Sequence, residues 1–184
     1  MRVSKRILCG SLLLLLASSA PLRAQGTTPE ETEKSCRAFV QEFYTWYVAR
    51  ALKIKSGDSS EYALRNRASS FSPELTRRLR QDLAASKKAE EIVGLEMDPF
   101  LNAQDNAERY VAGKVTPRGE GFWVAVYRLE SGKRAPAPDV TPEVVFKDGR
   151  WVFVNFHYGK EGGAERENLL SLLKALRLER QKNT

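Results

Sequence analysis

The stretch DPFLNAQD, residues 98–105, holds the residue types that most resemble a chemical site. It places two carboxylates, Asp98 and Asp105, around the side-chain amides of an Asn and a Gln. If Pro99 starts a helical turn, Asp98, Asn102 and Asp105 point in one direction. A carboxylate at the mouth of an apolar cavity can have a raised pKa and serve as a general base. The stretch is therefore a candidate ligand-binding or catalytic site.

The same residues also have a structural interpretation, which the sequence favours. An Asp before a Pro opens turns and helices, because its carboxylate accepts backbone N–H groups two or three residues later. Phe100 and Leu101 would then enter the core, and Asp105 would precede the first strand. On this interpretation the stretch is the hinge between helices and sheet, and Asp98 acts mainly as a cap.

Other catalytic chemistry finds little support in the sequence. His157 is the only histidine, and its place between large aromatic residues of a strand indicates a hydrogen-bonded packing residue. Zinc sites need several Cys or His ligands, and a calcium loop needs ligands at alternate positions with a Gly at the sixth. GxSxG, GxGxxG and GxxxxGK[ST] patterns do not occur. The sequence therefore predicts no metal and no cofactor.

The densest basic run contains Arg77, Arg78 and Arg80 and continues with Lys87 and Lys88. A solvated helix face is the simpler explanation of this run. The functional explanation is a weak contact with an anionic partner outside the cytoplasm, such as an envelope polymer. Export of the chain argues against nucleic acid as that partner.

Residues 1–24 have the order of a secretory signal peptide: basic residues, an apolar run, then the small residue Ala24. The apolar run is shorter than the ~20 residues that span a bilayer. We expect cleavage after Ala24, a periplasmic or secreted protein, and no membrane span afterwards. Four basic residues and no acid leave with this segment, so the net charge falls from +7 to +3. Cys9 also leaves, and Cys36 remains alone on an apolar helical face, where we expect it to be buried and unpaired.

Helical signals come first in the remaining chain. Thr28, Pro29 and Glu31 form a capping box with Pro at the first helical position, and the helix should run to about Lys53. Its Tyr44 and Trp46 lie off the apolar stripe and are expected at an edge or a pocket mouth. A short helix is expected over residues 61–68. A third starts at Pro73, carries Leu75, Leu79 and Leu83 on one face, and continues through residues 87–93 toward Gly94.

Strand signals follow, and then a last helix. We expect strands over residues 109–115, 122–129, 141–146 and 150–158, a tight hairpin with positive φ at Asp148–Gly149, and a helix over 165–181 with Leu169, Leu172, Leu173 and Leu176 as its stripe. Alternation in the last strand puts Trp151, Phe153, Asn155 and His157 on one face and Val152, Val154, Phe156 and Tyr158 on the other. Because both faces carry bulk, this strand is expected at the centre of the sheet.

The order of these elements predicts an α+β fold, with helices packed on one face of an antiparallel sheet. A long first helix against a curved sheet would enclose a cavity. The expected division of the chain is a signal peptide at 1–24, a polar lead-in and helix start at 25–35, a single domain at 36–178 and a polar tail at 179–184.

The motifs FVQEFYTWYV (residues 39–48), DPFLNAQD and DGRWVFVNFHYG (residues 148–159) together resemble the domain of unknown function 3828 family. Its members are mostly exported or envelope-attached bacterial proteins. The resemblance covers roughly residues 36–176 and implies a cystatin-like or nuclear transport factor 2-like cone fold. It implies no established reaction, so it assigns no catalytic residues.

These observations favour an exported non-enzymatic module of the bacterial cell envelope that binds an unknown ligand or protein partner. The alternative is a small isomerase- or hydratase-like enzyme that uses Asp98 or Asp105 as general base in the cone cavity. Cone-fold enzymes of that kind add a Tyr or a second acid, and only Tyr44 and Tyr47 fit that role here. The candidate binding or hinge residues are thus Asp98, Asn102, Asp105, Tyr44, Tyr47 and His157.

Overall fold

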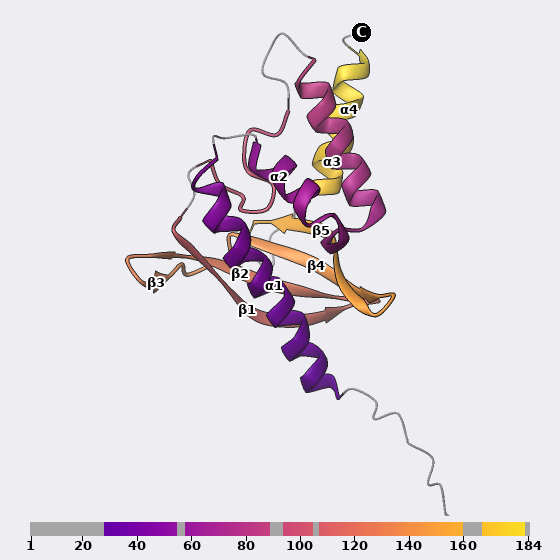
Figure 1. Ribbon diagram of the computed structural model, residues 1–184. Coiled ribbons are helices and arrows are strands. Elements are labelled where there is room, and N and C mark those ends of the chain that lie inside the picture. Colours follow the sequence, from indigo (N-terminus) through magenta and orange to yellow (C-terminus); the bar gives the residue numbers. More distant parts are fainter. Residues whose placement is uncertain (1–27, 55–57, 89–93, 105–106, 160–166, 183–184) are drawn as a thin grey trace, which may run out of the picture.

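Three helices, an antiparallel sheet and a last helix follow one another in the computed structural model, which describes residues 28–54, 58–88, 94–104, 107–159 and 167–182 (Figure 1). The elements are α1 Pro29–Ala51, α2 Asp58–Asn66, a 3-10 turn Ala68–Ser70, α3 Pro73–Ser86, β1 Arg109–Arg118, β2 Gly121–Glu130, β3 Lys133–Arg134, β4 Val140–Lys147, β5 Arg150–Tyr158 and α4 Leu169–Lys182. The predicted α+β class is confirmed. The predicted signal peptide lies outside the described residues.

Side chains cap the starts of α1 and α3, and the predicted capping box of α1 is confirmed. Thr28 Oγ1 accepts from the backbone N–H of Glu31 at 3.2 Å, and the Glu31 carboxylate accepts from the backbone N–H of Thr28 at 2.8 Å. Ser72 Oγ caps α3 by accepting from the backbone N–H of Leu75 at 3.2 Å, and no reciprocal bond forms because Leu75 stands where α1 has Glu31. The expected continuation of α3 through residues 87–93 is wrong at its start, because α3 ends at Ser86 with Lys87 as its C-cap.

The sheet has the strand order β1-β2-β4-β5, with every pair antiparallel and β3 added beside β2. The predicted hairpin is present, with φ of 51° at Asp148 and 76° at Gly149. The expected central position of β5 is wrong, since β5 is an edge strand. Its outer side is nevertheless covered, because the backbone N–H of Ser72 donates to the Phe153 carbonyl and that of Tyr158 donates to the Glu167 carbonyl.

The predicted faces of β5 are wrong beyond residue 153, because the strand contains a β-bulge. Glu143 pairs with Asn155 but its neighbour Val144 pairs with Phe153, so β5 carries one extra residue at position 154. One inserted residue reverses the alternation beyond it. Phe153 and Phe156 consequently lie on the same face, with stacked rings 5.2 Å apart.

α1 crosses that face of the sheet (Figure 1), and aromatic side chains fill the space between them. Phe43 contacts Phe153 at 4.8 Å between ring centroids, and Phe100 contacts Phe156 at 5.0 Å. Tyr44 is fully buried, so its expected position at an edge is wrong. Trp46 is partly buried and packs on this core. Cys36 is a buried free thiol, as predicted.

α3 and α4 lie side by side beyond the β5 edge (Figure 1). Leu169 and Leu173 of the predicted leucine stripe are buried there. Arg180 Nη2 lies 2.7 Å from Asp82 Oδ1, and this ion pair joins the two helices. α4 extends to Lys182, beyond the expected domain boundary at Leu178. Within the part of the chain that the structure describes, no helix is long and apolar enough to cross a membrane.

Candidate functional site

The DPFLNAQD stretch begins with a closed turn. The backbone N–H of Asp98 donates to the Ala103 carbonyl at 3.0 Å, and the N–H of Asn102 donates to the Asp98 carbonyl at 2.9 Å. Asn102 has a φ of 52°, a left-handed conformation that Asn tolerates better than most residues. The local sequence explains this shape, because Asp98–Pro99 opens the turn and Asn102 ends it.

Both oxygens of the Asp98 carboxylate are engaged within this turn and with α1. Oδ1 accepts from the backbone N–H groups of Phe100 at 2.9 Å and Leu101 at 3.2 Å. Oδ2 accepts from the hydroxyl of Tyr47 at 2.6 Å. Burial raises the pKa of Asp98 to about 6, and these three hydrogen bonds act against that rise because they favour the ionised form. Both carboxylate oxygens therefore have hydrogen-bond partners, as expected of a cap.

Three buried tyrosines hold the turn against α1 and β5. Besides Tyr47, Tyr44 donates from its hydroxyl to the Phe100 carbonyl at 2.8 Å, and Tyr158 donates to the Pro99 carbonyl at 2.7 Å. Burial raises the pKa of all three hydroxyls well above the ordinary value, so each stays protonated and can donate. Both Tyr44 and Tyr47 therefore belong to the hinge.

Asn102 and Asp105 do not complete a set with Asp98. The Asn102 side chain donates to the Asp139 carbonyl at 2.9 Å, so it has a different partner from Asp98. Asp105 lies outside the described residues. The arrangement expected from a single helical turn, with Asp98 and Asn102 pointing together, is not the one that these hydrogen bonds produce.

His157 lies away from this turn, on the sheet face opposite α1. Its Nε2 is 2.8 Å from Glu143 Oε2, and its ring packs against Trp123 at 4.0 Å between centroids, tilted by 30°. Arg118 covers Trp123, with its guanidinium 4.8 Å from the ring centroid. Sequence reasoning missed Trp123 and Glu143 as neighbours of His157. Because β4 lies between β2 and β5, knowledge of this strand order would have placed Trp123, Glu143 and His157 next to one another.

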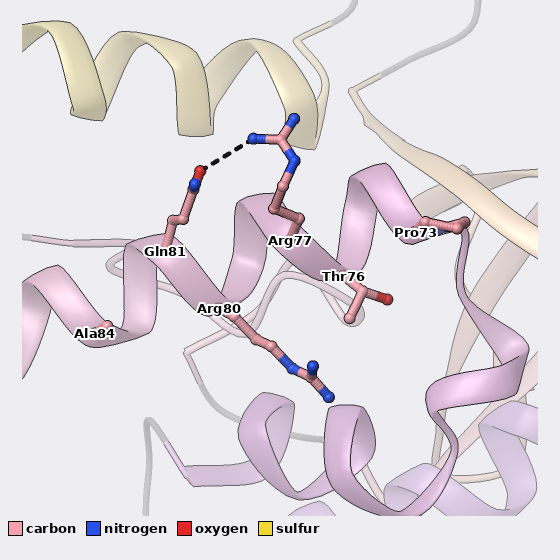
Figure 2. Close-up of a pocket in the computed structure, with 6 residues that line it drawn as sticks. All are labelled: Pro73, Thr76, Arg77, Arg80, Gln81 and Ala84. Carbon is pink, nitrogen blue, oxygen red and sulfur yellow. Dashed lines mark hydrogen bonds between the residues drawn. The ribbon is translucent and has the colours of Figure 1, made fainter.

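The basic run divides between two grooves along α3. Arg77 and Arg80 line the first groove with Pro73, Thr76, Gln81 and Ala84, in a space of about 540 Å³. Figure 2 shows the two guanidinium groups leaving α3 in opposite directions, with Arg77 donating to Gln81. The second groove, of about 500 Å³, lies between α3 and α4 and is lined by Arg78, Gln81, Asp82, Ala85, Leu173, Arg177, Arg180 and Gln181. The three arginines therefore do not share one face. Sequence reasoning also missed the α4 arginines, although their spacing of three residues was visible.

Comparison with known proteins gives no match, whether to a family model, a curated protein or a solved structure. The resemblance to the domain of unknown function 3828 family therefore stays a prediction from the sequence motifs. Among the described residues, no group of three or more Cys, His, Asp and Glu side chains is arranged to hold a metal ion.

Proposed function

We propose that this chain is an exported, non-enzymatic binding module of the bacterial cell envelope that binds its ligand or protein partner at its surface. Export rests on the signal-peptide pattern of residues 1–24. The cystatin-like or nuclear transport factor 2-like cone belongs to the same proposal, and the packing of α1 across one face of an antiparallel sheet supports it.

The observation that carries the proposal is the engagement of the Asp98 carboxylate. An enzyme of the isomerase or hydratase type needs a base and a second polar group that converge on a point where substrate can bind. Here Tyr47, the second group, is hydrogen-bonded to Asp98 itself. Phe100 and Phe153, both fully buried, occupy the space on the α1 face of the sheet. A partner is therefore expected at the outer surface, where both grooves lie.

A first experiment tests whether small compounds bind in the interior, near Asp98, or only at the surface. Backbone amide NMR spectra of the mature protein are recorded with a library of small apolar and planar compounds. We expect no saturable shift at the amides of Asp98, Phe100 and Leu101. A compound that shifts those amides, and that loses binding in Asp98→Asn with the fold retained, overturns the proposal and supports the enzyme.

A second experiment tests partner binding in the cell envelope. Gln81 lines both grooves, so a photo-reactive amino acid at position 81 reports on either one. The matched control places it at the exposed Ser131, in the β2–β3 turn. We expect a discrete crosslinked species, identified by mass spectrometry, from position 81 and not from position 131. Equal, diffuse crosslinking from both positions contradicts a specific binding surface on α3.

A further inference from the structure

Positive charge is concentrated on α3, its C-terminal turn and α4. This α3–α4 arm, residues 73–88 and 169–182, holds nine basic and three acidic side chains, whereas the rest of residues 25–184 holds seventeen basic and twenty acidic ones. The basic residues of the arm are Arg77, Arg78, Arg80, Lys87, Lys88, Lys174, Arg177, Arg180 and Lys182. The arm therefore accounts for the whole positive net charge of residues 25–184.

The arm is also where the two grooves lie, one on each side of α3. Gln81 lines both of them. Arg78 and Arg177 line the groove between α3 and α4, from opposite helices. Asp82 and Arg180 line the same groove and form an ion pair at 2.7 Å that joins the two helices.

Much of this positive charge is not neutralised within the described part of the chain. Arg77 and Arg78 share one carboxylate, that of Glu74, at 3.9 Å and 3.6 Å. Arg177 and Lys174 are exposed and have no ion pair among the described residues. The pair of Arg77 with Glu74 is exposed and contributes little to stability, whereas the Arg78 side chain is partly buried at 25% exposure.

We propose that the α3–α4 arm binds an extended polyanion, a polymer with repeated phosphate or carboxylate groups, with Arg78 and Arg177 as its principal contacts. The inference rests on the proposed function and names the partner class for its surface. Guanidinium groups suit this ligand because they bind both oxyanions with two parallel hydrogen bonds. Two grooves that share the residue Gln81 suit a polymer better than a single small anion.

The surface of the arm favours a polyanion over an acidic protein. Protein interfaces need an apolar, water-excluded centre with a few large anchoring side chains. Within the described residues, Leu178 is the only large hydrophobic side chain of the arm that is strongly exposed. Long cationic side chains around open grooves instead match a ligand held mainly by charge.

The test titrates the mature protein with inorganic polyphosphate of defined length, followed by amide NMR shifts and calorimetry at low and high salt. We expect shifts at α3 and α4, and weaker affinity at higher salt because screening reduces charge attraction. The double variant Arg78→Gln/Arg177→Gln should bind about tenfold more weakly. The matched control, Arg109→Gln/Arg150→Gln, removes the same charge from exposed sheet positions and should change affinity less than about twofold. Thermal melts establish that both variants fold.

Three outcomes overturn the inference: absent binding of both polyphosphate and poly-glutamate at low salt, equal weakening by the control pair, or shifts spread over the sheet instead of the arm. A protein crosslinked from position 81, with no binding of either polyanion, overturns the inference but leaves the proposed function standing. A parallel titration with poly-glutamate separates the two sources of anionic charge. Tighter binding of polyphosphate assigns a phosphate polymer and tighter binding of poly-glutamate a carboxylate polymer, and either result supports the inference.

Discussion

The Tyr47 hydroxyl donates to Asp98 Oδ2 at 2.6 Å, and this bond joins the middle of α1 to the turn that precedes the sheet. The residues are 51 positions apart in the sequence. The other oxygen of the same carboxylate caps its own turn. One side chain therefore satisfies a local backbone requirement and fixes a long-range contact, which explains why an acid can stand so close to the aromatic core.

Removal of the Asp98 carboxylate should destabilise the protein. Asp98→Ala loses the cap and leaves the buried Tyr47 hydroxyl without its acceptor, so we expect the free energy of unfolding to fall by about 1–2 kcal/mol in urea denaturation. Asp98→Asn keeps an oxygen for the backbone N–H groups and should lose less than half of that. Tyr62→Phe is the control, because Tyr62 lies on α2 and stacks on Trp46 away from the turn. A ligand or partner lost from Asp98→Ala with unchanged stability would instead favour a binding site.

The same carboxyl should make stability depend on pH. Since burial raises the pKa of Asp98 from 3.8 to about 6, protonated Asp98 contributes stability that is full below about pH 4 and is lost as pH rises through 6. Comparison of wild type with Asp98→Asn should show wild type losing up to about 3 kcal/mol more between pH 4 and pH 7. A difference that stays flat across this range would contradict a raised pKa.

The comparison with Asp98→Asn also removes effects of other acids. Hydrogen bonds from Thr28 lower the pKa of Glu31, and a hydrogen bond from Lys87 lowers the pKa of Glu61. Both act in the opposite sense, because stability from a lowered pKa is lost as pH falls. They occur equally in both proteins, so the difference reports Asp98.

The buried thiol of Cys36 gives a prediction with a simple readout. Burial raises its pKa to about 12, so almost no reactive thiolate is present near neutral pH. A thiol reagent should react slowly with the native mature protein and rapidly after denaturation. A disulfide-linked dimer on a non-reducing gel would show that Cys36 is accessible.

The parts of the fold that were predictable from the sequence are those with short-range causes. Thr28 and Ser72 precede Pro at helix starts, and Asp148–Gly149 suits a turn with two positive φ angles, so neighbours a few residues apart determine these features. The cap role of Asp98 is visible for the same reason, because Pro99 follows it directly.

The parts that could not be predicted depend on contacts between distant segments. The extra residue at position 154 has no composition signal of its own, yet it moves Phe156 to the α1 face and leaves His157 on the other. Tyr44 lies off the apolar stripe of α1 but is buried, because the Phe100 carbonyl supplies an acceptor from 56 residues away. The spacing of apolar residues predicts which face of a helix is buried. It does not predict where a buried polar group finds a hydrogen-bond partner.

The loss of stability should differ according to which partner of the Asp82–Arg180 ion pair is removed. The Asp82 side chain is 7% exposed and that of Arg180 is 21% exposed, so a stranded Asp82 carboxylate is the harder of the two charges to hydrate. We expect Arg180→Met to lower the free energy of unfolding by about 3 kcal/mol and Asp82→Asn by about 1 kcal/mol. The double variant should lose less than the sum of the two, because it leaves no unpaired buried charge.

Arg177→Met is the matched control on the same helix, where an exposed side chain should change stability by less than about 0.5 kcal/mol. Urea denaturation measures all four, and a loss in Arg180→Met no larger than in Arg177→Met would mean that this pair does not hold α4 against α3.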